Sequence, residues 1–479
     1  MVGWKYREFP QHYPRPGWVE HDPEAIWAAV VATLGELVED LDGAPVAAIG
    51  ITNQRETSVL WDRDTGEPLA PAIVWQDRRT APVCDRLRDA GHTGLVRRKT
   101  GLVLDPYFSA TKVSWLLTTG GVEPRPSVAF GTVDSWLVWK LTGGAVHATD
   151  PSNASRTLLY DIRALDWSEE LCELFDVPVS VLPEVLPSCG RFGVTTSEIP
   201  CGPGVPVSGI LGDQQAALFG QACLKAGMAK NTYGTGSFIL VNMGHECPDP
   251  IEGLLTTVAW TVPTSEGLVT HYALEGSVFV TGAAVQWLRD GMGFIEDASA
   301  VETLAASVPD SGGVVFVPAF TGLGSPWWDP YARGLLIGLT RGVTKAHIAR
   351  ATLEAIAFQT RDVVETVASE TSVAVDKLRV DGGASRNHLL LQIQADQLGV
   401  PVQRPVVSET TAYGAALMAG LAERVWSSLD EVGELWRCEV EVSPSSEKST
   451  ADRAWEQWRR AVERSRGWAS AVDDEAHGH

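Results

Sequence analysis

The chain has 479 residues, which is too long for a single hydrophobic core and predicts two domains of ordinary size. Its formal net charge of −22 argues against nucleic acid or an anionic membrane surface as a partner. The seven cysteines are scattered without C-x-x-C spacing, which disfavours a zinc site or a disulfide framework and favours reduced thiols in a cytoplasmic protein. No apolar run approaches the length of a membrane span, and the N-terminus lacks a signal-peptide pattern.

The first part of the chain alternates helix and strand patterns, which is typical of an α/β domain. Asp22-Pro23 indicates a helix start, because Asp can cap a helix and Pro fits its first turn. An apolar strand pattern follows over Val46–Ile51, and Thr52–Thr57 comes directly after it. The adjacent Arg55 and Glu56 are either a surface ion pair of little energetic value or a donor and an acceptor that grip hydroxyl groups.

The central stretch, Val205–Phe238, places an acid close to a glycine turn. An apolar strand ends at Gly212, and Asp213 follows it at the start of an alanine-rich helix. A second strand near Met228–Thr232 runs into Gly234–Gly236, whose backbone N–H groups can approach an anion closely. An acid that takes a proton and a turn that holds a phosphate are what phosphoryl transfer to an alcohol needs. Taken separately, each piece is better explained as an ordinary turn or helix cap.

The pattern restarts in the second half of the chain. A helix is predicted near Ser277–Asp290, and the strand Leu378–Val380 ends in Asp381–Gly383. This strand end echoes Gly212-Asp213, which suggests two related α/β halves with a boundary near Gly220. There is no Walker A motif and no G-x-G-x-x-G between strand and helix, which disfavours the P-loop and Rossmann folds.

Nine segments along the chain carry a further signal. They are GWVEHDP at 17–23, ITNQRET at 51–57, AIVWQDRR at 72–79, DPYFS at 105–109, NASRT at 153–157, GDQQAALFGQ at 212–221, NTYGTG at 231–236, PAFTGLGSPWWDPYAR at 318–333 and VDGGA at 380–384. In this order they resemble the FGGY carbohydrate kinases of the actin–hexokinase superfamily. The pair GWVEHDP and ITNQRET is characteristic of the glycerol kinases within that family.

The resemblance implies an α/β fold of two ribonuclease H-like domains, as in the actin-like ATPases, on either side of a deep cleft. Residues 1–220 would form the N-terminal domain with the polyol site, and residues 221–479 the C-terminal domain with the nucleotide site. It also implies ATP and Mg²⁺ as cofactors and glycerol as the substrate that is phosphorylated. Members of the family are often homodimers or homotetramers.

The site residues are carried over by the same resemblance. The implied polyol site consists of Arg55, Glu56, Tyr107, Asp213 and Gln214, with Trp75 and Phe238 as apolar walls. Asp213 would be the catalytic general base for the attacking hydroxyl. The implied nucleotide site has Thr235 and Gly236 at the phosphates, with Gly282, Gln286, Gly383 and Asn387 around the rest of ATP. Without the family, the last four would be interpreted as helix-packing and turn residues, and the three aromatic residues as core.

The chain departs from the family pattern at its start. Family members open with a strand and an Asp-x-Gly-Thr-Thr/Ser-Ser loop, whose Asp helps to hold Mg²⁺. The resemblance here begins inside the expected third strand, at Arg7–Phe9, so the first domain is expected to be truncated and the metal ligands are unassigned. The chain as written is therefore expected to show little or no turnover.

Three interpretations remain open at this point. The start of the chain was assigned too late, or the chain is a degenerate kinase that binds glycerol or a nucleotide without transferring phosphate. We favour the first, because the remaining site residues are intact. The third is a kinase for another polyol or a sugar such as xylulose, which Arg55, Glu56 and Trp75 disfavour.

Overall fold

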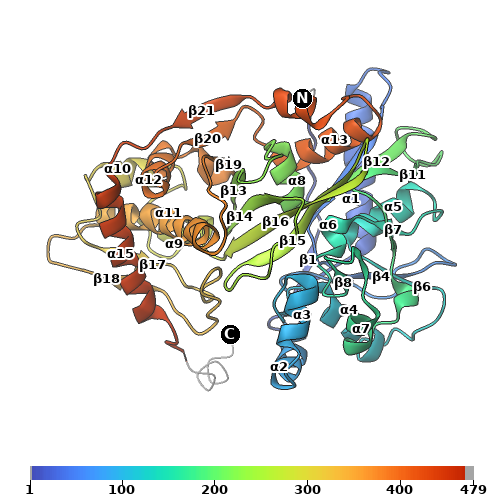
Figure 1. The fold of residues 1–479 in the computed structure, drawn as a ribbon, viewed down its shortest axis with the longest axis horizontal. Coiled ribbons are helices and arrows are strands. Elements are labelled where there is room, and N and C mark those ends of the chain that lie inside the picture. Colours follow the sequence, from blue (N-terminus) through green and yellow to red (C-terminus); the bar gives the residue numbers. More distant parts are fainter. Residues whose placement is uncertain (1–2, 470–479) are drawn as a thin grey trace.

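The structure is a computed structural model that describes residues 3–469, and it is built from α/β elements in both halves of the chain (Figure 1). The first half contains β1 (Gln11–His12), β2 (Glu20–His21), α1 (Pro23–Asp40), β3 (Ile49–Asn53), β4 (Val59–Asp62), β5 (Ala72–Ile73), α2 (Ala81–Asp89), α3 (Thr93–Thr100), α4 (Ser109–Thr118), β6 (Val128–Gly131), α5 (Val133–Leu141), β7 (Ala148–Thr149), α6 (Pro151–Ala154), β8 (Tyr160–Asp161), β9 (Asp166–Trp167), α7 (Glu169–Leu174), the 3-10 helix η1 (Val179–Val181), β10 (Glu184–Val185), β11 (Cys189–Val194), β12 (Pro206–Gly212) and α8 (Asp213–Gly220).

The second half is organised around a larger sheet. It contains β13 (Ala229–Tyr233), β14 (Ser237–Gly244), β15 (Leu255–Thr264), β16 (Gly267–Val278), α9 (Gly282–Asp290), α10 (Ala300–Ala306), β17 (Val315–Val317), β18 (Leu335–Ile337), α11 (Lys345–Glu370), β19 (Leu378–Gly382), the 3-10 helix η2 (Gly383–Arg386), α12 (His388–Leu398), β20 (Val402–Pro405), α13 (Thr410–Ala422), α14 (Leu429–Leu435), β21 (Cys438–Val442) and α15 (Lys448–Ser465).

In the first half, β12 forms the middle of a three-stranded sheet in the order β11-β12-β3. It is antiparallel to β11 and parallel to β3, and Gly212 lies opposite Asn53. Since parallel strands end at the same edge of a sheet, the segment after β3 and the start of α8 leave this edge together. Arg55 and Asp213, which are far apart in the sequence, are thereby brought to one place.

In the second half, seven strands form a sheet in the order β15-β16-β14-β13-β19-β20-β21. Strands β13 and β14 form an antiparallel hairpin around Gly234–Gly236, and β13 runs parallel to β19 with Tyr233 opposite Gly382. A Cβ atom on Gly382 would lie 2.3 Å from the Tyr233 carbonyl oxygen, so this approach requires glycine. The hairpin turn and the glycine-rich end of β19 are therefore neighbours.

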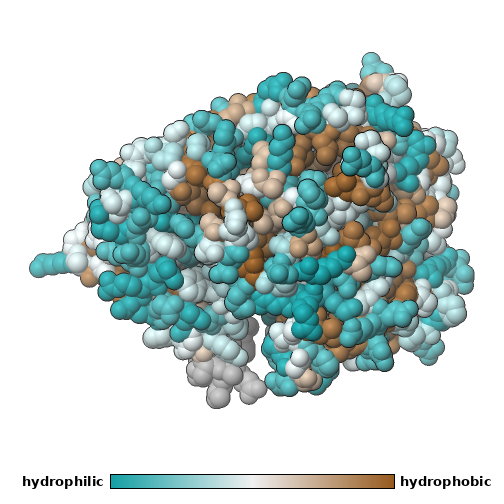
Figure 2. Space-filling model, in the orientation of Figure 1, coloured by the Kyte–Doolittle hydropathy of each residue, from teal (hydrophilic) through white to brown (hydrophobic). Residues whose placement is uncertain are grey.

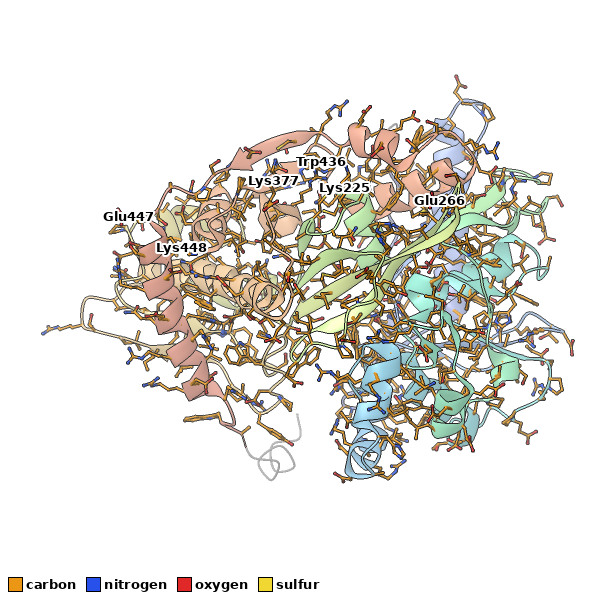
Figure 3. All side chains as sticks on the ribbon, viewed as in Figure 1. Lys225, Glu266, Lys377, Trp436, Glu447 and Lys448 are labelled. Carbon is orange, nitrogen blue, oxygen red and sulfur yellow. The ribbon has the colours of Figure 1, made fainter. Side chains whose placement is uncertain are left out.

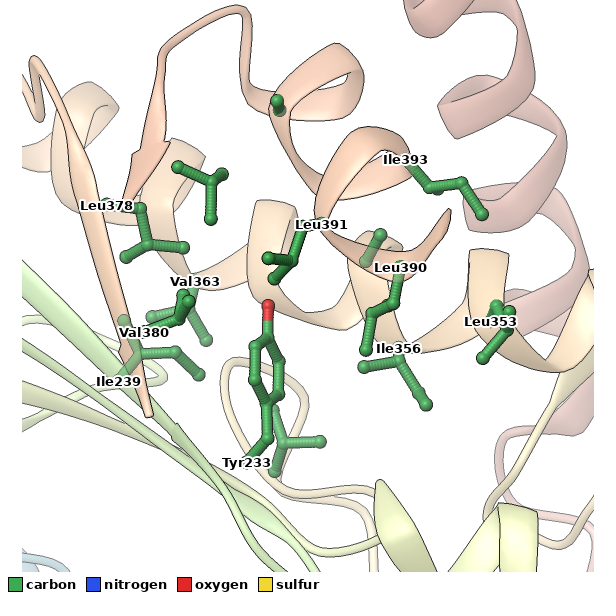
Figure 4. Close-up of a cluster of buried hydrophobic side chains, with 14 of the residues drawn as sticks. Tyr233, Ile239, Leu353, Ile356, Val363, Leu378, Val380, Leu390, Leu391 and Ile393 are labelled. Atoms are coloured by element: carbon green, nitrogen blue, oxygen red, sulfur yellow. The ribbon is translucent and has the colours of Figure 1, made fainter. Parts of the chain in front are cut away.

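The hairpin turn is anchored in a large hydrophobic core between the sheet and helices α11 and α12. Figure 4 shows Tyr233 projecting from the sheet toward Leu391, with Leu390 and Ile356 to one side. The Tyr233 hydroxyl donates a hydrogen bond of 2.9 Å to Gln394 Oε1, which satisfies its buried polar atom. The residue that precedes the turn is thus fixed at both its backbone and its side chain.

Helix α13 returns from the second half to pack on the first (Figure 1). It crosses α8 so closely that a Cβ atom on Gly414 would lie within van der Waals overlap of the Ala216 carbonyl oxygen, at 1.9 Å. A Cβ atom on Gly50 of β3 would lie 2.2 Å from the Ala415 carbonyl oxygen. In Figure 2 hydrophobic residues gather around the position of α13, which is apolar on most of its faces. The two halves are joined by this backbone-to-backbone contact.

A second link ties the end of α8 to the end of β19. Trp436, which is labelled in Figure 3, donates its indole N–H to Gln221 Oε1 at 3.1 Å. The amide of Gln221 donates in turn to Asp381 Oδ2 at 2.8 Å, and the Thr410 hydroxyl donates to the same oxygen at 2.7 Å. The Asp381 carboxylate on β19 therefore holds both the end of α8 and the start of α13.

Most of the sequence-based element boundaries are close to those observed, with two differences. Asp22 caps α1 by accepting a hydrogen bond from the Glu24 N–H at 2.9 Å, as its pattern predicts. The helix predicted near Ser277–Asp290 begins only at Gly282, because β16 continues to Val278 in the hairpin ladder. Residues 7–9, which the resemblance assigned to a strand, have no strand conformation. In residues 3–469 no helix combines the length and the apolar character that crossing a bilayer demands.

Candidate active site

Asp213 is the first residue of α8 and stands at the end of β12. Its side chain is 32% exposed, whereas the neighbouring Arg55 side chain is 2% exposed. Arg55 Nε lies 3.1 Å from Asp213 Oδ1. The backbone and side-chain N–H groups of Gln214 donate to the two carboxylate oxygens at 2.8 and 3.0 Å. The carboxylate is held in place and remains open to solvent, as a general base must be.

Arg55 lies over the backbone of Gly212. A Cβ atom at position 212 would lie 2.8 Å from Arg55 Cδ, so glycine at the strand end makes room for the guanidinium. The guanidinium donates to Gln215 Oε1 at 3.2 Å and to the Tyr107 hydroxyl at 3.4 Å. It also forms two hydrogen bonds with Glu275, of 2.5 and 3.0 Å, in the paired geometry that Arg and a carboxylate favour.

A buried network of two arginines and two glutamates underlies the site. Arg156 donates to Glu56 Oε1 at 2.7 Å and to Glu275 Oε1 at 3.0 Å. The side chains of these three residues and of Arg55 are each at most 2% exposed. Burial alone would raise the pKa of Glu275, but the charges of Arg156 and Arg55 outweigh it and hold that pKa at about 2. For Glu56 burial outweighs the same two cations, and its pKa is raised. The charges of the four groups balance, which makes their burial tolerable.

Sequence reasoning assigned no role to Glu275 or Arg156. Arg156 lies in the NASRT segment, which served only to recognise the family. Glu275 lies in the middle of β16, between Leu274 and Gly276, in an otherwise buried strand. An acid in a buried strand is stable only beside a buried cation, so the sequence pattern around Glu275 could have indicated a buried ion pair. The sequence could not show that the cations come from the other half of the chain.

Tyr107 and Trp75 form one wall of the site. Their rings meet edge to face at a centroid distance of 5.5 Å. The loop that carries Tyr107 is fixed by Lys112, whose ammonium donates to the carbonyl oxygens of Pro106, Tyr107 and Phe108 at 3.0, 2.6 and 2.7 Å. Burial lowers the pKa of Lys112 to about 7, although the carboxylates around it oppose the shift.

Phe238 is the second predicted apolar wall, and it comes from the other half of the chain. The Arg55 guanidinium carbon lies 6.0 Å from the centre of its ring. Phe238 is only partly buried and is the second residue of β14, just after the glycine turn. Of the predicted polyol residues, Arg55 therefore contacts Asp213, Tyr107 and Phe238. Trp75 contacts Tyr107, and Glu56 is joined to the group through Arg55 and Arg156.

The strand end before Asp213 is supported by another buried acid, Asp150. It caps α6 by accepting from the N–H groups of Ser152 and Asn153, and it accepts from the Ser188 hydroxyl at 2.7 Å. The Ser152 hydroxyl then accepts a hydrogen bond of 2.9 Å from the Gly212 N–H. Burial raises the pKa of Asp150, while the hydrogen bonds that it accepts oppose the shift. The hydrogen bonds that join Asp150, Ser152 and Gly212 therefore help to fix the position of Asp213.

The predicted nucleotide residues lie on three elements of the second half. Thr235 is exposed in the hairpin turn and accepts hydrogen bonds from the Thr281 and Ala283 N–H groups at 2.9 and 3.0 Å. Gly282 begins α9 and donates to the Gly234 carbonyl at 3.0 Å, where a Cβ atom would lie 2.6 Å from that oxygen. The turn and the N-terminus of α9 therefore form one unit.

The remaining nucleotide residues flank this unit. Gln286 is exposed on α9, and Gly383 is exposed at the start of η2 with open space where a Cβ atom would be. Asn387 caps α12 through its side-chain oxygen, which accepts from the Leu390 N–H at 2.8 Å. Its amide group can still donate to a ligand. Since β13 and β19 are adjacent, the turn at 234–236 and the Gly383 loop share one edge of the sheet.

Mg²⁺ in kinases is usually held by one or two carboxylates, water and the phosphates of the nucleotide. Within residues 3–469 no group of three or more His, Cys, Asp or Glu side chains could hold a metal ion. Asp381 is buried, and its Oδ2 already accepts from both Gln221 and Thr410. This donor set fits an ion that arrives on the nucleotide and does not fit a resident protein site.

The fold and the site define the protein as a carbohydrate kinase. The N-terminal domain profile of the FGGY family of carbohydrate kinases matches residues 1–220, and the C-terminal domain profile matches residues 229–423. The chain therefore belongs to the FGGY family of carbohydrate kinases, as its motifs predicted.

Curated relatives and solved structures agree with this family. "Glycerol kinase" of Aromatoleum aromaticum is 56% identical over 477 residues, covering 98% of this chain and 95% of the relative. "Glycerol kinase 2" of Thermotoga maritima is 54% identical over 468 residues, covering 96% and 93%. The crystal structure of Plasmodium falciparum glycerol kinase with ADP matches with a TM-score of 0.91 and 36% identity, over 96% of this chain and 92% of that one. The predicted two-domain actin-like fold is thereby confirmed.

Proposed function

We propose that this protein is an ATP:glycerol 3-phosphotransferase, which converts glycerol and Mg-ATP into sn-glycerol 3-phosphate and ADP in glycerol catabolism. One observation carries the proposal: a half-exposed carboxylate, Asp213, lies 3.1 Å from a buried arginine that also contacts Tyr107. Relatives more than 50% identical over nearly the whole chain are named glycerol kinases, which supports the same substrate.

Glycerol is a three-carbon chain with a hydroxyl group on each carbon, and the side chains around Asp213 match its polar and apolar parts. Arg55 supplies a donor, and Glu56, whose Oε1 is bound to Arg156, supplies Oε2 as an acceptor. Trp75 and Phe238 provide aromatic surface for the carbon chain. A site that pairs each hydroxyl rejects analogues that lack one, because the buried partners would be left unpaired.

In the proposed reaction, Asp213 accepts the proton of a terminal hydroxyl while the oxygen attacks the terminal phosphorus of ATP. Arg55 holds the Asp213 carboxylate in its orientation before the substrate arrives. Backbone N–H groups near Thr235 and Gly236 face the phosphates, and Gly282, Gln286, Gly383 and Asn387 surround the rest of the nucleotide. Mg²⁺ bound to the nucleotide would neutralise phosphate charge.

A substrate panel tests this function. ADP release is measured with Mg-ATP and glycerol, xylulose, gluconate or xylitol, and the product is identified with an enzyme specific for sn-glycerol 3-phosphate. We expect glycerol to give the highest kcat/KM. Turnover of another polyol in preference to glycerol would contradict the proposed substrate, and calorimetry that shows glycerol binding without any product would indicate a binding protein.

Light scattering on the same sample tests the expected homodimer or homotetramer. We place the reaction in the cytoplasm because ATP is the donor.

A further inference from the structure

Lys230 is a buried lysine beside the catalytic carboxylate that the proposed reaction does not use. It lies on β13, four residues before Gly234, and its side chain is fully buried. Its ammonium has three N–H groups and three acceptors: Gln214 Oε1 at 2.5 Å, the Thr232 hydroxyl at 3.0 Å and the Phe238 carbonyl at 3.2 Å. A buried ammonium costs stability unless it is fully paired, so its retention here calls for an explanation.

The contact with Gln214 determines which way that amide faces. An ammonium can only donate, so the oxygen of the amide must lie toward Lys230. The amide nitrogen then lies toward Asp213, where it donates to Oδ2 at 3.0 Å. If the amide were reversed, its nitrogen would face an ammonium and its oxygen would face a carboxylate, and both contacts would be repulsive.

Lys230 also holds the glycine turn. Thr232 and Phe238 lie opposite each other on the two strands of the hairpin whose turn is 234–236. By bonding to both, the ammonium ties the base of that hairpin to Gln214 on α8. The turn proposed for the phosphates and the base proposed for the hydroxyl are therefore joined through one side chain.

We propose that Lys230 is a positioning residue, which orients Gln214 so that its amide donates to Asp213 and which sets the Asp213 carboxylate relative to the phosphate turn. The inference rests on the proposed function, since the role concerns the base of that reaction. Lys230 acts through Gln214 and through its charge.

The charged groups around Lys230 come from four elements. They are Asp381 of β19, Asp213 of α8, Glu275 of β16 and Arg55 after β3. Burial lowers the pKa of Lys230 to about 8, although the three carboxylates oppose the shift. The ammonium is therefore charged at neutral pH and loses its proton as the pH rises above about 8.

The first test is Lys230→Met, which keeps the length of the side chain and removes its charge and its donors. We expect kcat to fall about 10-fold to 100-fold with glycerol, because a catalytic group displaced by a fraction of its contact distance loses rates of this order. We expect the glycerol KM to change less than kcat, since Lys230 reaches the substrate only through Gln214. Melting temperature and circular dichroism check that the variant folds.

The pH profile separates positioning from a merely structural role. Without a charged Lys230, nothing fixes the Gln214 amide with its nitrogen toward Asp213, so the base is no longer held in one orientation. The wild-type kcat/KM should therefore fall as the pH rises above about 8, and this basic limb should be absent in Lys230→Met. The same basic limb in a folded Lys230→Met variant would overturn the proposal.

Two further variants test the path through Gln214. Gln214→Glu keeps the contact with Lys230 but removes the donor to Asp213, so it should lower kcat as Lys230→Met does. In a Gln214→Met background, Lys230→Met should add little, because both changes remove the same interaction. Full additivity of the two changes would contradict the proposal. Lys99→Met, a lysine on α3 that pairs with Asp161 away from the site, is the matched control and should leave kcat and the profile unchanged.

Calorimetry keeps this inference distinguishable from the proposed function. Glycerol affinity measured from pH 6 to 10 should weaken above about pH 8 in the wild type and not in Lys230→Met, without any need for turnover. A wild-type protein that neither binds nor phosphorylates glycerol would contradict the proposed function. A wild-type protein that binds glycerol with the same pH dependence as Lys230→Met would contradict the role of Lys230 alone.

Discussion

Arg55 and Glu275 form a pair of hydrogen bonds, of 2.5 and 3.0 Å, between the two halves of the chain. Arg55 follows β3 in the first half, and Glu275 lies within the seven-stranded sheet of the second. Glu275 also accepts from Arg156 at 3.0 Å, so one carboxylate of the second half holds two arginines of the first. The orientation of Arg55 toward Asp213 therefore depends on how the two halves sit against each other.

Replacing Glu275 with glutamine should destabilise the protein and weaken glycerol binding. The change keeps the size of the side chain but leaves two buried guanidinium groups with only one carboxylate between them, which costs about 3–5 kcal/mol in comparable buried pairs. Because Arg55 loses its bidentate partner, the glycerol KM should rise more than kcat falls. Thermal denaturation and steady-state kinetics of Glu275→Gln measure both effects.

The matched control is Glu252→Gln, whose side chain is 93% exposed and pairs with Arg97 at the surface. It should leave stability within about 0.5 kcal/mol of the wild type. Equal effects of the two changes would show that the buried network contributes no more to stability than a surface ion pair.

The contribution of Glu275 to stability also depends on pH. The pKa of Glu275 is about 2 against an ordinary 4.5, so its stabilising contribution is present above pH 4.5 and is lost as the pH falls toward 2. Glu275→Gln should lack this acid-dependent loss.

Replacing Asp213 with asparagine should abolish the general base and leave the fold intact. We expect kcat to fall by about 10²–10⁴-fold, because an amide cannot take the proton of the hydroxyl. Its side chain is 32% exposed, so the melting temperature should change little. Asp249→Asn, at an acid that is 97% exposed and paired with Arg163, is the control and should keep full activity. If Asp213→Asn retained wild-type kcat, another residue would have to be the base.

The positions of the chemical groups along the chain were largely predictable. A carboxylate directly after an apolar strand and a glycine turn directly after another are local patterns, and Asp213 and Gly234–Gly236 occupy those positions in the structure. In the structure β12 pairs in parallel with β3, which brings Arg55 to Asp213. Local periodicity indicates where strands end, and the strand ends indicate where a candidate site lies.

The partners of the charged groups were not predictable in the same way. Arg55 and Glu275 are separated by 220 residues, and no periodicity relates them. Lys230 lies on a strand that was predicted without any role for it, and it is fully buried because the Gln214 amide oxygen, the Thr232 hydroxyl and the Phe238 carbonyl supply three acceptors. A buried charge is stable only with its partners, and those partners are set by the packing of the two halves, which no local pattern describes.

Asp362 on α11 should make the stability of the protein depend on pH. Three indole N–H groups donate to its carboxylate, from Trp455 at 2.7 Å, Trp458 at 2.8 Å and Trp327 at 3.3 Å. Burial nevertheless raises the pKa of Asp362 to about 6, with the three indoles opposing the shift. Because the folded pKa is above the ordinary 3.8, this carboxyl contributes most stability below pH 3.8, and the contribution is lost as the pH rises through 6.

The variant Asp362→Asn removes that titration. Between pH 7 and pH 4 the wild type should gain about 2–3 kcal/mol relative to the variant, as expected for a shift of roughly two pH units. Denaturant unfolding, followed by tryptophan fluorescence across this range, measures the difference. Parallel stability curves for the wild type and Asp362→Asn would show that the indoles already compensate for burial in full.

Adding a single methyl group at Gly414 should separate the two helices that join the halves. The new Cβ atom would lie 1.9 Å from the Ala216 carbonyl oxygen, so α8 and α13 must move apart, at a cost of about 2–4 kcal/mol. Gly420 lies on the same helix, but there a Cβ atom would meet only Trp426 at 3.4 Å, and Gly420→Ala should be neutral or stabilising by up to about 1 kcal/mol through helix propensity. Melting temperatures of the two variants compare the effects directly. Since α8 begins with Asp213, Gly414→Ala should also lower kcat, and a Gly414→Ala enzyme as stable and active as Gly420→Ala would disprove the importance of this crossing.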